Sequence, residues 1–164
     1  MNPELTAAVL SPEEFRRACS RYATGVSVTT VEGADGVPQG LTVNSFTSVS
    51  LAPPLVLVCI DKAADTHSHF LAANGFAINI LAEEQIDLSR HFATFAGDRF
   101  DGISWQPGLH GAPILEGVLA SLECAMHARF DGGDHTIFVG QVERVTVHPR
   151  TPLVYFAGAY RKLG

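Results

Sequence analysis

Residues 117–147 carry the clearest structural pattern in the chain: Gly117–Phe130 (GVLASLECAMHARF), then Asp131-Gly132-Gly133-Asp134, then His135 and Thr136–Val147 (TIFVGQVERVTV). Gly117–Phe130 is predicted to be a long strand, and Thr136–Val147 is rich in the β-branched residues that strands favour. The glycine pair between two aspartates is typical of a tight turn. The stretch therefore predicts a long antiparallel hairpin, with His135 held at the start of the returning strand.

The rest of the chain predicts further strands, many of them joined by turns. These strands are expected at residues 26–31, 39–46, 55–60, 76–81, 154–156 and 159–162. The run Leu55–Ile60 is apolar on both faces, as in a fully buried strand. Helices are expected at 11–23, 65–73 and 83–95, the first opened by a capping box of Ser11 and Glu14. Residues 97–111 are predicted to be a loop.

Strands and helices do not alternate regularly along the chain, which argues against a doubly wound parallel sheet. The pattern favours a mainly β fold, an antiparallel barrel with a few peripheral α-helices. No internal repeat or linker divides the sequence. Residues 11–164 are therefore expected to form a single domain that follows a loose tail at residues 1–10.

Composition excludes several classes of protein. The 164 residues include 11 Lys and Arg against 17 Asp and Glu, a net charge of −6, which argues against nucleic acid or an anionic membrane as the main partner. No apolar run approaches the roughly 18 residues of a membrane span, and the N-terminus lacks the basic start of a signal peptide. Cys19, Cys59 and Cys124 form no C-x-x-C, as expected of reduced thiols in a cytoplasmic protein.

The common catalytic and nucleotide-binding motifs do not occur in the sequence. It contains no G-x-G-x-x-G, no G-x-x-x-x-G-K-[ST] and no G-x-S-x-G. His67-Ser68-His69, His127 and His135 do not follow a zinc-binding spacing, so no metal site is predicted. Any nucleotide must therefore be bound without a Rossmann or P-loop cradle.

Short segments that combine polar, charged or aromatic residues with turn signals are the candidates for a binding site. They are Gly40–Ser50 (GLTVNSFTSVS), Asp61–His67, Arg90-His91-Phe92 and Gly132–His135. The hydroxyls and the amide of the first segment suit a phosphate and a polar heterocycle, and a helix start near Lys62 and Thr66 also suits a phosphate. The structural alternatives are an edge strand, a plain helix cap, a solvated helix face and a surface histidine.

Longer motifs that contain these segments occur in a characteristic order. They are Tyr22–Val26 (YATGV), Gly40–Leu51 (GLTVNSFTSVSL) with Pro53-Pro54, Phe76–Leu81 (FAINIL), Gly133-Asp134-His135, and Pro152–Tyr155 with Tyr160. Together they resemble the flavin reductase component of two-component flavin-dependent monooxygenases. The resemblance runs from about residue 12 to the C-terminus. Each motif alone is weak, but the ordered set is specific.

The resemblance implies an antiparallel split β-barrel, the FMN-binding split barrel of Greek-key type, that forms a homodimer with the flavin near the subunit interface. It implies an enzyme that oxidises NADH or NADPH, reduces FMN or FAD by hydride transfer to flavin N5, and releases the reduced flavin to a separate monooxygenase. FMN and FAD are not distinguished by the sequence. NADH is favoured over NADPH because no arginine cluster is available for a 2′-phosphate.

The resemblance also implies site residues. The isoalloxazine edge and ribityl chain would bind Thr42, Val43, Asn44 and Ser45. The phosphate would be surrounded by Ser48, Ser50, Lys62, Thr66 and Arg90. The same groove would be lined by Cys59, Ile60 and Asp61, and Phe92 would also contact the cofactor. His135 would position the nicotinamide, with Tyr160 beside it.

Two other functions are compatible with the same barrel. A non-catalytic flavin-binding or storage protein would bind flavin tightly and would not react with NADH. A redox-silent interaction module would bind no flavin. The combination of Asn44-Ser45-Phe46 with Gly133-Asp134-His135 favours the reductase.

Overall fold

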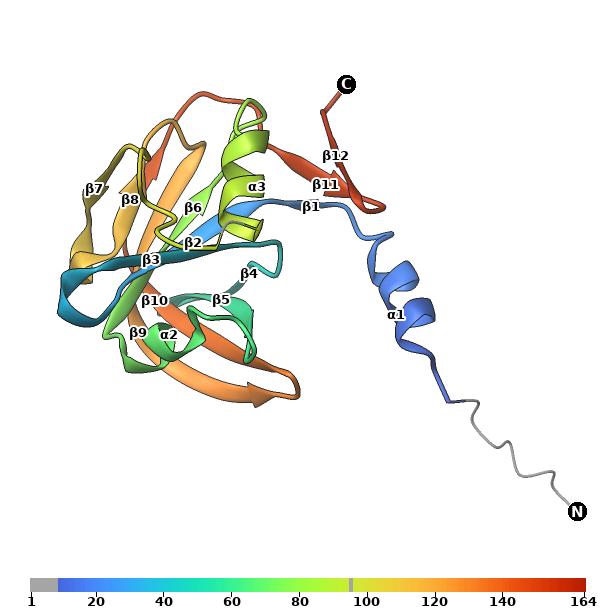
Figure 1. Cartoon of the computed structure of the whole chain (residues 1–164), viewed down its shortest axis with the longest axis horizontal. Coiled ribbons are helices and arrows are strands. Elements are labelled where there is room, and N and C mark those ends of the chain that lie inside the picture. The colour runs from blue at the N-terminus through green and yellow to red at the C-terminus, as the bar shows by residue number, and fades with distance from the viewer. Residues whose placement is uncertain (1–8, 95) are drawn as a thin grey trace, which may run out of the picture.

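The computed structural model of the chain describes residues 9–94 and 96–164, and seven of the described strands form one antiparallel sheet (Figure 1). The strand order is β3-β2-β6-β9-β10-β5-β4. The bounds are Ser27–Glu32 for β2, Pro38–Val43 for β3, Thr47–Leu51 for β4, Pro54–Asp61 for β5, Gly75–Ile80 for β6, Ala120–Gly132 for β9 and His135–Val147 for β10.

The two edge strands of this sheet are neighbours in the sequence. Strand β3 ends at Val43 and β4 begins at Thr47, and a connection this short spans at most about 14 Å. The sheet must therefore curl until its edges approach each other, which gives the split β-barrel expected from the resemblance. The Ser45 hydroxyl holds this connection against β5, because it accepts a hydrogen bond from the Cys59 N–H (2.9 Å) and donates one to the Cys59 carbonyl (3.0 Å).

The long hairpin predicted from residues 117–147 is present as β9 and β10. His135 pairs with Gly132, so Gly133 and Asp134 form the turn, and Gly133 has a φ of 78° that glycine adopts without strain. Strand β9 begins at Ala120 rather than Gly117. The pairing shifts between Val139 and Gly140 and again between Val142 and Arg144, which bends the hairpin around the barrel.

Two smaller sheets complete the strands described. Strands β1 (Thr24–Gly25), β11 (Val154–Phe156) and β12 (Ala159–Arg161) form one, and β7 (Trp105–Pro107) and β8 (Pro113–Leu115) form the other. The sequence predicted β11 and β12, but β7 falls in the expected loop at 97–111. Buried Asn79 fixes β8, since its amide donates to the Pro113 carbonyl (3.3 Å) and its carbonyl accepts from the Leu115 N–H (2.9 Å).

Strand β5 differs from its prediction. Both of its faces are apolar, but only Val56, Val58 and Ile60 are buried, in a core cluster with Phe70 and Phe138. Alternate residues Leu55, Leu57 and Cys59 are half-buried. An apolar face predicts that something covers the strand, but it does not say whether the cover comes from the same chain.

The helices are shorter than predicted. They are α1 (Pro12–Cys19), α2 (His67–Ala72) and α3 (Ile86–Thr94). The capping box at α1 is confirmed, with the Glu14 N–H donating to Ser11 Oγ (3.2 Å) and the Ser11 N–H donating to Glu14 Oε2 (3.1 Å). Thr66, in contrast, precedes α2 without forming a side-chain cap. No described helix is long and apolar enough to cross a membrane.

Helix α1 extends away from the barrel (Figure 1), and none of its residues is buried. The helix predicted at 11–23 contains the large apolar residues Phe15 and Tyr22, yet Phe15 is 58% exposed and Tyr22 is 79% exposed. The predicted tail at residues 1–10 falls mostly on residues 1–8, which lie outside the described part of the chain. Val9 and Leu10, at its end, are exposed.

Candidate functional site

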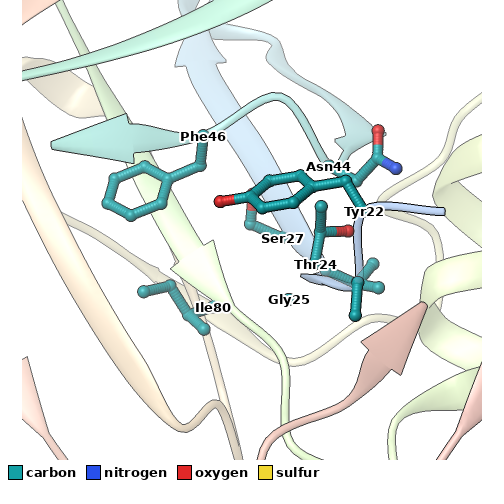
Figure 2. Close-up of a pocket in the computed structure, with 9 residues that line it drawn as sticks. Tyr22, Thr24, Gly25, Ser27, Asn44, Phe46 and Ile80 are labelled. Carbon is teal, nitrogen blue, oxygen red and sulfur yellow. The ribbon is translucent and has the colours of Figure 1, made fainter. Parts of the chain in front are cut away.

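Two cavities flank the connection between β3 and β4. The first, of about 180 Å³, is drawn in Figure 2, and the second has about 210 Å³. Val26 and Asn44 line both of them. Since Asn44 is exposed on the connection between the edge strands, its amide is available to a ligand in either cavity. The polar segment Gly40–Ser50 is therefore located at two adjoining hollows, as a binding site requires.

The walls of the first cavity are divided about equally between polar and apolar surface. Figure 2 shows the Tyr22 ring extending across it toward Phe46, with Ile80 also at its wall. The polar groups include Ser27 Oγ, which donates a long hydrogen bond to the Val43 carbonyl (3.4 Å), and Thr24 Oγ1, which is buried with no hydrogen-bond partner among the described residues. The cavity can therefore accept a flat ring that carries polar atoms at its edge.

The second cavity is built around Tyr160. The Tyr160 hydroxyl and Ser89 Oγ are 2.8 Å apart, and Thr42 Oγ1 donates to the Ser89 carbonyl (2.6 Å). The Tyr155 and Tyr160 rings meet edge to face with their centroids 5.4 Å apart, and Arg90 Cζ lies 5.5 Å from the centroid of Tyr160. These contacts join β3, α3 and the β11–β12 pair around one hollow. They bring together Thr42, Arg90 and Tyr160, which the sequence predicted separately.

Ser45 and Cys59 are also brought together, but by bonds to each other. The Ser45 hydroxyl already bonds both main-chain groups of Cys59, so its hydrogen bonds stabilise the barrel. Burial raises the pKa of the Cys59 thiol, which keeps the sulfur neutral at physiological pH.

His135 lies on the tip of the β9–β10 hairpin, opposite Asp61 at the end of β5. Its Nδ1 lies 2.7 Å from Asp134 Oδ1, and this hydrogen bond holds the pKa of the Asp134 carboxyl below its usual range. A carboxylate accepts only, so Nδ1 carries the proton and Nε2 is left to face a ligand. Lys62 is engaged at the same tip, with Nζ 2.5 Å from Asp131 Oδ1 and 2.6 Å from the Gly133 carbonyl.

The remaining predicted residues divide into surface and core. Ser48 is exposed and Ser50 half-buried on β4. Ile60 and Thr66 are fully buried, main chain included. Phe92 is 1% exposed and packs edge-on against Phe100 with centroids 5.1 Å apart. Its side chain belongs to the core and not to the walls of the two cavities, contrary to the expectation from the sequence.

Several residues at the site, Ser89 and Tyr22 among them, were not among the sequence-predicted contacts. The sequence did not predict Ser89 at the site, because a serine in a helix is usually solvated. Its hydrogen bond to the Tyr160 hydroxyl shows that it faces the second cavity. Tyr22 lay in the predicted helix at 11–23 and in the YATGV motif, but no contact with a ligand was predicted for it. Among residues 9–94 and 96–164, no three His, Cys, Asp or Glu side chains are grouped closely enough to bind a metal ion.

Comparison with known proteins connects this geometry to a family. Residues 19–164 match the flavin reductase like domain. The NADH-dependent FAD reductase of Streptomyces globisporus is 43% identical over 155 residues, which cover 91% of this chain and 84% of that protein. The reductase component of the flavin-dependent trigonelline monooxygenase of Acinetobacter baylyi is 44% identical over 153 residues. These cover 93% of this chain and 49% of the relative, so the chain spans about half the length of that protein.

The fold comparison agrees. The structure of the Streptomyces globisporus C-1027 NADH:FAD oxidoreductase in complex with NAD and FAD fragments superposes with a TM-score of 0.88 and 42% identity, and the match covers 96% of this chain and 98% of that one. The similarity takes in the curled antiparallel sheet, the segment between β3 and β4, and the hairpin that carries His135. By sequence and by fold together, the chain belongs to the flavin reductase like domain family.

Proposed function

We propose that this protein is an NADH-dependent flavin reductase that reduces FMN or FAD and supplies the reduced flavin to a separate monooxygenase. The observation that carries the proposal is the pair of adjoining cavities at Asn44 in a chain of this family. The Streptomyces relative is named as an NADH-dependent FAD reductase, and the Acinetobacter relative as the reductase component of a monooxygenase.

The residues present fit a flavin. A cavity of roughly 150 Å³ is known to accept a benzene ring, and the two cavities here have volumes of about 180 and 210 Å³. Thr24 Oγ1 is buried beside the first cavity and has no hydrogen-bond partner within residues 9–94 and 96–164, and the Asn44 amide is exposed between the two cavities. Walls that combine apolar side chains with polar groups are suited to a fused ring system with polar edges.

Each part of the site has a distinct role in this proposal. The Thr42–Ser45 segment binds the ring edge and ribityl chain, chiefly through main-chain groups and Asn44, because the Thr42 and Ser45 hydroxyls are already bonded within the protein. Ser48, Ser50 and Arg90 lie near the phosphate. When both nucleotides are bound, hydride passes from the nicotinamide to the flavin. His135 positions the nicotinamide through Nε2, and no protein nucleophile is needed.

The proposed assembly is a homodimer. Helix α1 presents Phe15 to solvent and contributes no residue to the core, while Leu55 and Leu57 leave one face of β5 half-buried. A second copy that covers these apolar surfaces would remove them from water. We further propose a cytoplasmic location, which the free thiols of Cys19, Cys59 and Cys124 support.

The test is NADH consumption in air, measured with no added flavin, then with FMN, then with FAD. Consumption only after flavin is added supports a reductase that releases its product, and the relative rates rank the two flavins. A protein that binds flavin but leaves NADH unchanged would instead be a flavin-storage protein. His135→Ala is expected to slow turnover or to weaken nicotinamide binding while the chain still folds, and unchanged steady-state kinetics would remove His135 from the site.

A further inference from the structure

We propose that Lys62 is a positioning residue for His135, which it holds in place by fixing the tip of the β9–β10 hairpin, rather than a ligand of the flavin phosphate. The inference rests on the proposed function, because it concerns the histidine that meets the nicotinamide. It reassigns a residue that the family resemblance implied for phosphate binding.

Lys62 makes three hydrogen bonds to the hairpin tip, which we call the Lys62 clamp. Nζ donates to Asp131 Oδ1 (2.5 Å) and to the Gly133 carbonyl (2.6 Å), and the Lys62 N–H donates to the Asp134 carbonyl (2.9 Å). One residue at the end of β5 therefore holds both sides of the turn. Charge-assisted bonds of this kind are shorter and stronger than neutral ones.

Apart from the main-chain pairing of β9 with β10 and of His135 with Asp61, the tip has few contacts. Residues 131–134 are all exposed, and a Cβ added at Gly133 would meet nothing within 4 Å. Packing cannot fix a segment that touches so few neighbours, so its position depends on its hydrogen bonds. His135 follows directly, and Asp134 orients its ring through the 2.7 Å bond to Nδ1. Movement of the tip would therefore turn the imidazole away from the ligand.

The same contacts make Lys62 a poor phosphate ligand. An ammonium group has three N–H donors, and two of those on Lys62 already point to a carboxylate and a carbonyl. A phosphate would have to compete with the Asp131 carboxylate for the charge. Arg90, in contrast, forms an ion pair among the described residues only with exposed Asp87, at 3.6 Å, and lies over the Tyr160 ring, so its charge is less engaged than that of Lys62.

The experiment compares Lys62→Met with Asp131→Asn, since the two roles predict opposite results for the second variant. If Lys62 acts through the hairpin, both substitutions raise the KM for NADH by roughly three- to tenfold, and both leave the Kd for FMN within about twofold of wild type. The double variant is then no worse than Lys62→Met alone, because the contact between Lys62 and Asp131 is one of the two that Lys62→Met already removes. Lys162→Met and Asp101→Asn, two exposed positions outside the site, are the matched controls.

A second readout does not depend on activity. In the flavin-free protein, the clamp variants should shift and broaden the NMR signals of the His135 ring and speed amide hydrogen exchange at residues 132–135. The main-chain bond from Lys62 to Asp134 and the pairing of His135 with Asp61 remain in both variants, so the chain still folds.

Two results would overturn the proposal. One is weaker FMN binding in Lys62→Met with unchanged or tighter binding in Asp131→Asn, which is the pattern of a phosphate ligand. The other is an unchanged KM for NADH together with unchanged His135 signals in both variants. Failure of the proposed function is a separate result: the wild-type protein would then not oxidise NADH, while the NMR measurement would still report whether the clamp orders the hairpin.

Discussion

Replacing Ser45 with alanine should destabilise the protein, because its hydroxyl joins the connection between β3 and β4 to strand β5. Ser45 Oγ accepts from the Cys59 N–H at 2.9 Å and donates to the Cys59 carbonyl at 3.0 Å. Strand β4 pairs with β5 only as far as Leu57, so beyond that point the serine side chain takes the place of a neighbouring strand. Ser45→Ala leaves both main-chain groups of Cys59 without this partner.

The expected cost follows from the two lost bonds. Each hydrogen bond contributes about 0.5–1.5 kcal/mol net, so the free energy of unfolding should fall by about 1–3 kcal/mol. For a chain of 164 residues this corresponds to a fall in Tm of roughly 2–4 °C per kcal/mol. Urea unfolding followed by circular dichroism measures the change, with the protein concentration held constant so that subunit association does not alter the comparison.

Ser104→Ala is the control, since Ser104 is exposed and its hydroxyl makes no hydrogen bond to a described residue. A loss below about 0.5 kcal/mol in Ser45→Ala, equal to that of the control, would refute the structural role of the hydroxyl. FMN titration separates this role from direct binding. If Ser45 acts through the barrel, weaker FMN binding accompanies the loss of stability, whereas a direct flavin ligand would lose affinity without it.

Three further predictions concern the core and its ionisable groups. Burial alone would raise the pKa of Glu123, but hydrogen bonds from Arg144 and a main-chain N–H outweigh it and hold the pKa below its usual range. Glu123→Gln should therefore cost about 2 kcal/mol at pH 7, and urea unfolding should show this difference vanishing as the pH falls through the depressed pKa. Gly140→Ala should cost about 1–3 kcal/mol or more by the same assay, because the added Cβ would lie 2.7 Å from Cys124 Cβ. Burial raises the pKa of Cys124 to about 12, so iodoacetamide should label exposed Cys19 in the native chain and reach Cys124 only on unfolding, as peptide mass spectrometry would show.

The strands with strong local signals were predictable, and those that depend on tertiary contacts were not. The β9–β10 hairpin follows from its β-branched residues and from Gly132-Gly133, which are properties of the segment itself. Strand β8 is short and is held in place by buried Asn79, 34 residues away from Pro113 in the sequence. No local pattern contains that contact. The exposure of Tyr22 was not predictable for a related reason. A large apolar residue in a predicted helix suggests a covered face, but it does not identify what covers that face.

The site was predictable as a set of segments but not as a set of side-chain roles. Thr42, Asn44 and Tyr160 do line one cavity, and Arg90 lies over the ring of Tyr160. The helical position of Phe92 allowed either a core residue or a ring for stacking, and only the packing against Phe100 decides between them. Sequence can show that a residue type suits a ligand. It cannot show that another part of the chain already uses the group.

The hydroxyl and ammonium groups at this site are largely committed to the protein itself. Thr42 bonds the Ser89 carbonyl, Ser89 bonds Tyr160, Ser45 bonds Cys59, and Lys62 bonds the hairpin tip. A flavin would therefore meet main-chain groups, the Asn44 amide and apolar walls, with few charged side chains free to hold it. Such a site would orient a ring without binding it strongly. Orientation depends on rigid walls, whereas affinity depends on donors and acceptors that form new hydrogen bonds with the ligand. Rigid walls with few free donors are what a reductase that must release its flavin requires, and a storage protein would need the opposite arrangement.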